Sequence, residues 1–254
     1  MRYNIGEAND MKVTGRAKLI RYTANPEATI ALASKLCYSS RDVDDLIADI
    51  EAKDNARFIA MLHSMGHYSP FEHASFTFAI EGVSRALLAQ ITRHRIASFS
   101  VRSQRYVSEG DFNYIVPPAI AALGPEAEAE YERQMATMLD WYRGWQEKLG
   151  GAGESANEDA RFVLPNACET KMIVTMNARE LLHFFELRCC NRAQWEIREI
   201  AWQMLAEVMK VAPAVFASAG PGCLKGHCPE GKKSCGRAAE VRARKEALCA
   251  EEAE

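Results

Sequence analysis

The chain changes between a two-residue and a three-to-four-residue spacing of its apolar positions. Apolar residues alternate with small or polar residues over 74–81, which predicts a half-buried strand. A looser alternation over 12–23 and a β-branched, apolar run over 169–176 predict two further strands. Residues 98–105 are small and polar, and we expect them to form a loop or an extended segment.

The three-to-four-residue spacing predicts helices over several longer stretches. Asn25 is expected to cap the first of them, and Asn177, with Glu180 at the third helical position, is expected to cap a later one. The helix that starts near Ser84 should carry Arg93, His94 and Arg95 in its last turn. The expected helices cover residues 26–39, 43–65, 84–95, 125–149, 177–188 and 194–211.

Length and composition bound the domain organisation. The 254 residues, 48% of them hydrophobic, are enough for one sizeable core. From about residue 221 the chain becomes rich in Gly, Cys and Lys and then highly charged. We therefore expect one catalytic domain over 1–220 and a C-terminal extension over 221–254.

Charge and hydropathy exclude several classes of protein. The chain carries 31 basic and 34 acidic residues, a net charge of -3, which does not suit a general nucleic-acid coat protein. It has no run of about eighteen apolar residues and no apolar segment at its N-terminus. We expect a cytoplasmic protein that neither spans nor binds a membrane, with most of its eight cysteines as thiols.

One stretch, residues 93–106, is unusually dense in hydrogen-bond donors. It contains four arginines, His94 and three serines within fourteen residues. Arginine guanidinium groups suit phosphate and other anions, so this stretch is a candidate anion site. The alternative is a solvated basic face, or arginines that cap the carbonyl groups of a helix end.

The order of residues in this stretch resembles a family signature. Arg93-His94-Arg95, seven further residues, Ser103 and then Gln104-Arg105-Tyr106 closely resemble the motif of the flavin-dependent thymidylate synthases. Flanking segments extend the resemblance over roughly residues 12–215. They are 66–67, 69–73, Arg161 with 164–165, 177–179, 187–188 and 194–197.

The resemblance implies an α+β fold with helices packed around a small, mostly antiparallel sheet. It implies a methyltransferase that converts dUMP to dTMP by reductive methylation. Methylenetetrahydrofolate would supply the carbon, and FAD reduced by NADPH would carry the hydride. It also implies a homotetramer with active sites at subunit interfaces, and no metal or nucleic acid.

The same resemblance assigns residues to two ligands. Those assigned to dUMP are Gln90, Arg93, Ser103, Gln104, Arg105, Arg161 and Arg188. Those assigned to FAD are Ser39, His67, Ser69, Glu72, Arg93, His94, Arg95, Ile96, Asn177, Arg179 and His183. The sequence departs from the pattern of some relatives at Val101, His183 and Arg192.

Two of these residues, Arg188 and Ser103, are the catalytic candidates. Arg188 would lie against the uracil and stabilise negative charge that develops on the ring. No histidine and acid that could activate the Ser103 hydroxyl are identifiable, so we interpret Ser103 as a nucleotide contact rather than a nucleophile.

The cysteines raise two further alternatives. A synthase without flavin would need a nucleophilic cysteine, and Cys189 and Cys190, just after Arg188, come nearest to the motif. Cys223, Cys228 and Cys235, with His227, could form a metal cluster, but their spacing fits no common zinc pattern and free thiols are favoured. A third alternative is a non-catalytic nucleotide or RNA binder that uses the arginine cluster.

Overall fold

The computed structural model describes residues 11–250, which form two compact units. The first unit comprises the chain up to Arg16, Ile80–Thr92 and Ser100–Met172. The second unit comprises Ala17–Ala79, Arg93–Phe99 and the chain from Ile173 onward. The expected division into a domain over 1–220 and an extension over 221–254 remains a prediction.

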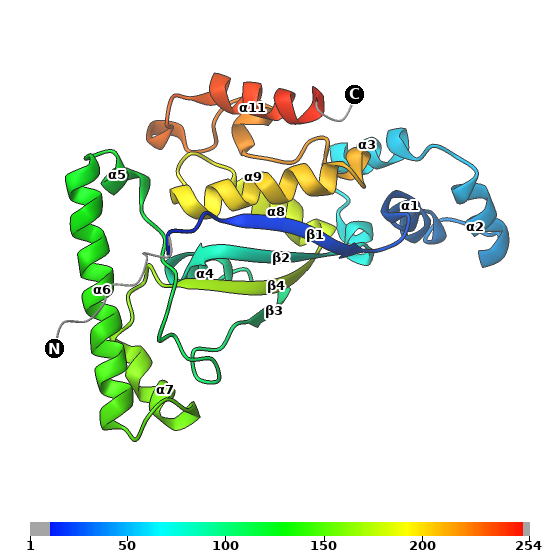
Figure 1. The fold of residues 1–254 in the computed structure, drawn as a ribbon. Helices are drawn as coiled ribbons and strands as arrows, with labels where there is room; N and C mark the ends of the chain where they lie inside the picture. Colours follow the sequence, from blue (N-terminus) through cyan, green and yellow to red (C-terminus); the bar gives the residue numbers. More distant parts are fainter. Residues whose placement is uncertain (1–10, 251–254) are drawn as a thin grey trace. The chain divides into compact units, whose positions relative to one another are not determined.

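A four-stranded antiparallel sheet has the strand order β1-β2-β4-β3 (Figure 1). Side chains alternate in burial along its central strands, as the sequence pattern predicts. The fold class, α+β with a small sheet, is confirmed. The strands are β1 (Arg16–Tyr22), β2 (Ser75–Ser84), β3 (Ala97–Val101) and β4 (Glu169–Asn177).

Edge strand β1 is covered by a helix of its own unit, α9 (Trp195–Met209). Figure 1 shows α9 running along β1, and two amides of the strand, Ala17 N–H and Leu19 N–H, donate to Gln203 and Glu207 on that helix at 2.9 and 3.1 Å. Side chains of α9 therefore satisfy backbone groups that a bare edge would leave open to another strand.

The second unit has helices near the N-terminus that differ from the expected ones in two ways. The single helix expected over 43–65 is two helices, because the chain turns between Glu51 and Ala56. Asn25 precedes the first helix in a left-handed conformation with φ of 46° and makes no side-chain cap. Helices α1, α2 and α3 cover Pro26–Leu36, Val43–Glu51 and Ala56–Ser64, and the remaining helices α8, α10 and α11 cover Ala178–Arg188, Pro213–Phe216 and Ala238–Ala250.

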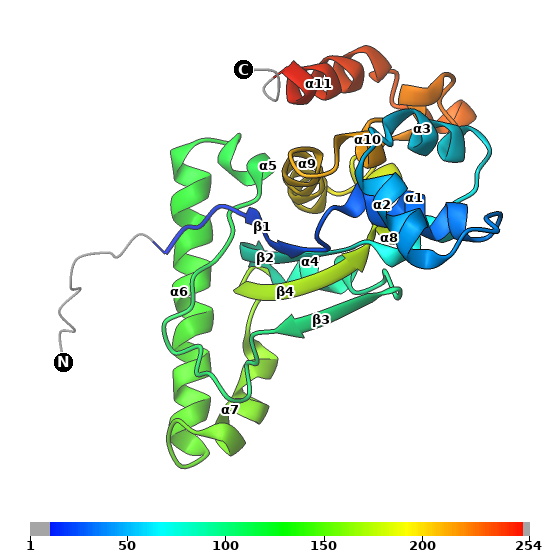
Figure 2. The ribbon, with the colours of Figure 1, turned by 90° about the vertical axis from the view of Figure 1, so that its right-hand side faces the viewer.

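The longest helix of the first unit is α6 (Pro125–Lys148), which has short helices at its two ends (Figure 2). Its Met135 and Leu139 pack with Phe112, Tyr114 and Cys168 in a buried cluster. The apolar side chains of this helix are only partly buried, because Trp145 is 47% exposed. The other helices of this unit are α4 (Arg85–Ile91), α5 (Pro118–Ala121), α7 (Glu154–Ala160) and the 3-10 helix η2 (Arg161–Val163).

The arginine motif does not lie in the last turn of a helix. Ser84 caps α4 by accepting a hydrogen bond from Leu87 N–H, but the helix ends at Ile91, where Thr92 donates its hydroxyl to Leu88 O. Arg93, His94 and Arg95 follow in the connection to β3. The motif is thus displayed by irregular backbone between a helix and a strand.

Within residues 11–250, no helix is both long and apolar enough to span a membrane.

Candidate active site

Residues Arg93–Ile96 line an open cavity of about 590 Å³ within the second unit. Among residues 11–250, no carboxylate pairs with the guanidinium of Arg93 or Arg95, and both side chains are exposed. Ile96, 67% exposed, adds an apolar surface to the same cavity. The lining residues are Arg93, His94, Arg95, Ile96, Glu180, His183, Leu187 and Arg188.

His94 is buried and links two polar side chains of α8. Its Nδ1 lies 2.8 Å from Glu180 Oε1, and its Nε2 accepts a hydrogen bond from Arg188 Nε at 3.1 Å. Phe184 packs edge-on against the imidazole with ring centroids 5.0 Å apart. Glu180 is itself fixed, because Asn177 caps α8 by accepting from Glu180 N–H at 2.9 Å.

The hydrogen bonds determine which nitrogen of His94 carries the proton. Arg188 can only donate, so Nε2 must be the acceptor and Nδ1–H must donate to Glu180. Burial lowers the pKa of His94 despite the opposing hydrogen bond from Glu180. The imidazole is therefore neutral at neutral pH, and the partner that orients Arg188 brings no negative charge to its guanidinium.

A second cavity in this unit, of about 190 Å³, is lined by Arg179 and His183. Arg179 also pairs with Glu72, which lies in the 3-10 helix η1 (Ser69–His73). Because His183 lines both cavities, it connects the arginine motif with Arg179. His183 is exposed rather than a core histidine.

The residues assigned to the nucleotide lie in the first unit, apart from Arg93 and Arg188. Ser103 opens a turn, and its hydroxyl oxygen accepts from the amides of Arg105 and Tyr106 at 3.2 and 3.4 Å. Asn157 holds the turn from α7 by donating to Arg105 O at 3.0 Å. The Ser103 hydroxyl thus shapes the backbone of the turn.

Arg105 and Arg161 both approach Glu158. The Arg105 guanidinium lies 2.8 Å from the Glu158 carboxylate and 2.6 Å from that of Glu154. Arg161 donates through Nε to Glu158 O at 3.0 Å. All three side chains of the Arg105 ion pairs are about half exposed, so an incoming anion can reach them.

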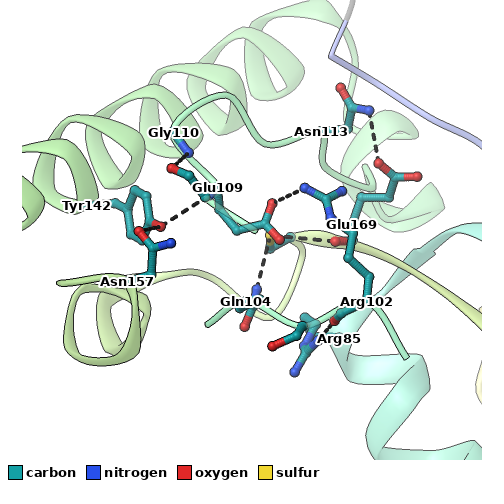
Figure 3. A network of polar contacts seen from close by, with 12 residues as sticks. Arg85, Arg102, Gln104, Glu109, Gly110, Asn113, Tyr142, Asn157 and Glu169 are labelled. Carbon is teal, nitrogen blue, oxygen red and sulfur yellow. Dashed lines mark hydrogen bonds and ion pairs between the residues drawn. The ribbon is translucent and has the colours of Figure 1, made fainter. Parts of the chain in front are cut away.

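A buried polar network supports the other side of this turn (Figure 3). Arg102 Nη2 donates to Glu109 Oε2 at 2.8 Å, and Glu109 is only 1% exposed. The amide of Glu109 donates to the Tyr142 hydroxyl at 3.1 Å. Arg85 donates to Arg102 O at 3.5 Å, the limit of a hydrogen bond. The network fixes both ends of the segment that carries Ser103 and Arg105.

Burial raises the pKa of Glu109 to about 7, against the opposing charges of Arg102 and Arg85. Nearby, Gln104 is buried and its amide donates to Cys168 Sγ at 3.6 Å. Burial raises the pKa of the Cys168 thiol to about 12, so Cys168 acts as a neutral partner for Gln104.

The structure brings some assigned residues together and leaves others apart. Arg93, His94, Arg95, Ile96, His183 and Arg188 share a cavity, and Arg105 and Arg161 meet at Glu158. Ser39, His67, Ser69 and Asn177 line neither of the two cavities described. Gln90 lies on α4, and its amide donates to Ala86 O of the same helix.

Sequence reasoning missed the residues that hold the assigned ones in place. Glu180 was recognised only as part of a helix cap, although its side chain orients His94. Arg102 was counted among the donors of residues 93–106, but its contact with Glu109, and that of Glu109 with Tyr142, gave no signal in the sequence, because the local pattern does not pair these side chains.

Comparisons with known proteins agree with the family resemblance. Residues 18–214 match the family described as thymidylate synthase complementing protein. A flavin-dependent thymidylate synthase of Geobacter sulfurreducens is 54% identical over 226 residues, which cover 88% of this chain and 95% of the relative.

Two further relatives carry the same description. The protein of Clostridium tetani is 50% identical over 237 residues, 89% of this chain and 95% of the relative. That of Pyrococcus furiosus is 41% identical over 229 residues, 85% of this chain and 89% of the relative. The expected family is thereby confirmed: the chain belongs to the flavin-dependent thymidylate synthases, a family of enzymes described as thymidylate synthase complementing proteins.

Proposed function

We propose that this protein catalyses the reductive methylation of dUMP to dTMP, with methylenetetrahydrofolate as carbon donor and FAD as the hydride carrier between NADPH and substrate. The observation that carries the proposal is the cavity around His94. Arg93 and Arg95 line it with no carboxylate partner in the described part of the chain, and Arg188 is oriented there by a neutral imidazole. Such preorganised cations suit an anionic cofactor and a reaction that develops negative charge.

FAD fits the donors and surfaces of the second unit. Its pyrophosphate needs cationic donors, which Arg93 and Arg95 offer, and its ring system needs a partly apolar slot, which Ile96 and Leu187 offer. We assign Arg179 and His183, at the neighbouring cavity, to the same cofactor. When bound, the flavin supplies the hydride chemistry that these side chains cannot perform.

We assign dUMP to the turn that contains Ser103, Gln104 and Arg105, with Arg161 as a second phosphate donor. Both arginines contact Glu158, Arg105 at its carboxylate and Arg161 at its main-chain carbonyl, and a dianion with several oxygens suits two such donors. Arg188 is assigned to the uracil ring, where its charge stabilises the electron density that builds up as the ring attacks the carbon donor.

A homotetramer with shared active sites is part of the proposal. Three large side chains are strongly exposed in the single chain: Ile96, itself assigned to FAD, at 67%, and Tyr106 and Phe162, which follow Arg105 and Arg161, at 68% and 83%. Exposed apolar and aromatic side chains next to functional residues are typical of surfaces that another subunit covers. We place the enzyme in the cytoplasm.

The decisive experiment measures flavin content and turnover of the purified protein. We expect a yellow protein with the absorption of oxidised flavin that forms dTMP only when NADPH is supplied. A colourless protein that takes up no FAD but binds nucleotides would instead be the non-catalytic binder. Formation of dTMP without NADPH would identify a cysteine-dependent synthase.

A further inference from the structure

Four cysteines from two distant segments line one small cavity in the second unit. Cys190 follows the end of α8, whereas Cys223, Cys228 and Cys235 belong to residues 220–236. The cavity encloses about 10 Å³, the room of roughly one water-sized particle. Cys223 and the residues after it lie beyond the 18–214 segment that matches the family.

The segment that carries three of these cysteines has almost no core of its own. In residues 220–236 only Gly220, Pro221 and Cys223 are buried, and the regular structure amounts to two short 3-10 helices, η3 (Gly222–Lys225) and η4 (Gly231–Lys233). Protein segments too small to bury a hydrophobic core are commonly held by disulfides or structural metals.

Polar contacts bring this segment to the end of α8. Arg192 pairs with Glu230 at 3.3 Å and donates to Lys233 O at 2.9 Å. Asn191 Nδ2 donates to Cys235 Sγ at 3.8 Å, which places this exposed thiol beside the residue that follows Cys190. These contacts place the segment that carries Cys223, Cys228 and Cys235 beside the end of α8, although these cysteines are 33 or more residues from Cys190 in the sequence.

Two residues next in sequence to these cysteines, Cys189 and His227, do not line the cavity. The side chain of Cys189 is fully buried and does not line this cavity. His227 is exposed and does not line the cavity.

We propose that Cys190, Cys223, Cys228 and Cys235 bind one zinc ion, which ties residues 220–236 to the end of α8. Four thiolates at the corners of a tetrahedron are a ligand set for structural zinc. On binding, the four thiols release their protons to solvent and form four Zn–S bonds, and no electrons are transferred.

The four cysteine side chains must rotate before they can bind one zinc ion. Within residues 11–250, no group of three or more His, Cys, Asp or Glu side chains is already arranged to hold a metal ion. Rotation about χ1 from one staggered position to the next moves a cysteine sulfur by roughly 3 Å. Such rotations of the four cysteine side chains into their shared cavity are part of the proposal.

Zinc at this position would stiffen a wall beside the candidate active site. An adjoining cavity of about 420 Å³ is lined by Cys190, Cys223 and Cys228 and also by Arg188. The zinc site itself does not depend on the proposed reaction, so its test is independent of turnover.

The first test is the zinc content of the full-length protein, purified under reducing conditions without chelators and measured by plasma mass spectrometry. We expect close to one zinc per chain in the wild type, and less than a fifth of that in Cys190→Ser and Cys223→Ser. Cys37→Ser and Cys249→Ser are matched controls, because both thiols are exposed and outside the cavity, and they should keep the wild-type content.

The second test uses the wild type alone, so that it does not depend on variants that fold. Removing zinc with a strong chelator should raise the rate of trypsin cleavage at Lys225, Lys232 and Lys233 at least tenfold, and added zinc should restore protection. Wild-type protein that contains no zinc and takes up none, iron in place of zinc, or a disulfide among the four cysteines would each overturn the proposal. Equal zinc loss in the control variants would overturn it as well.

Discussion

The arginines around His94 and those around Ser103 differ in what neutralises them. In the first region Arg93 and Arg95 have no carboxylate partner among residues 11–250, and Arg188 is oriented by a neutral histidine. In the second region Arg105 lies between Glu154 and Glu158. The first region therefore presents two guanidinium groups that no carboxylate of residues 11–250 neutralises. In the second region, two carboxylates of the chain neutralise Arg105.

This difference separates two ways of binding an anion. A ligand in the first region gains contacts with donors that lose only water. A phosphate in the second region must replace two carboxylates on Arg105, and it can do so because exposed ion pairs are weak and a dianion offers more oxygens. The carboxylates then lower nucleotide affinity but exclude weaker anions from the site.

The largest effect is expected from Arg188→Ala. Loss of a donor that stabilises developing charge should lower kcat about 100-fold or more. Bound FAD should remain, because Arg93 and Arg95 are unchanged. The measurements are dTMP formation at saturating substrate and flavin absorbance per chain. Arg57→Ala, an exposed arginine on α3, is the control. Flavin loss with normal turnover per bound flavin would make Arg188 a cofactor residue instead.

Arg105→Ala should have the next largest effect. We expect dUMP affinity to fall by at least about tenfold, because a charge-assisted contact to phosphate is lost, while FAD affinity is unchanged. Titration of each ligand separately measures both. A variant that binds dUMP normally but loses flavin would show that the two regions have been assigned to the wrong ligands.

The sequence predicted most helices and strands and the arginine motif. It did not predict the side-chain contacts that hold the motif residues of either region in place. Alternation predicted β2, a β-branched, apolar run predicted β4, and the spacing of Arg93 to Ser103 pointed to the family. The end of α4 was placed one turn too late, because no glycine or proline marks it and Thr92 closes the helix with its side chain.

The missing contacts are long-range. Glu180 meets His94 across 86 residues of chain, and Tyr142 meets Glu109 across 33. Helix periodicity explains why Glu180 lies in a first turn, but not which side chain its carboxylate will meet. Such pairings depend on tertiary packing, which a local pattern does not contain.

A smaller effect, in the opposite direction, is expected when the competing carboxylates are removed. The double variant Glu154→Gln/Glu158→Gln should bind dUMP roughly two- to fivefold more tightly, since each exposed ion pair is worth at most about 1 kcal/mol. Isothermal titration at low and moderate salt measures the gain, which should shrink as salt rises. Weaker binding would mean that the carboxylates position Arg105 rather than compete for it.

The smallest effect concerns Glu109 and the pH dependence of stability. In the folded protein the pKa of Glu109 is raised to about 7, whereas a glutamate in the unfolded chain has a pKa near 4.5. The stability that the protonated group contributes is complete below pH 4.5 and is lost as pH rises through 7. Glu109→Gln cannot ionise, so its Tm minus that of the wild type should increase by at least about 3 °C between pH 5 and pH 8.

Glu147→Gln is the matched control for this measurement, because Glu147 is an exposed carboxyl on α6 of the same unit. Its Tm difference from the wild type should stay nearly constant over the same range. If the difference for Glu109→Gln falls as pH rises, then Arg102 holds Glu109 ionised and the pair stabilises the fold. Arg102 in the interior and Arg105 at the surface of the second region would then both be paired with ionised carboxylates. The contrast with Arg93 and Arg95, which have no carboxylate partner among residues 11–250, would be sharper.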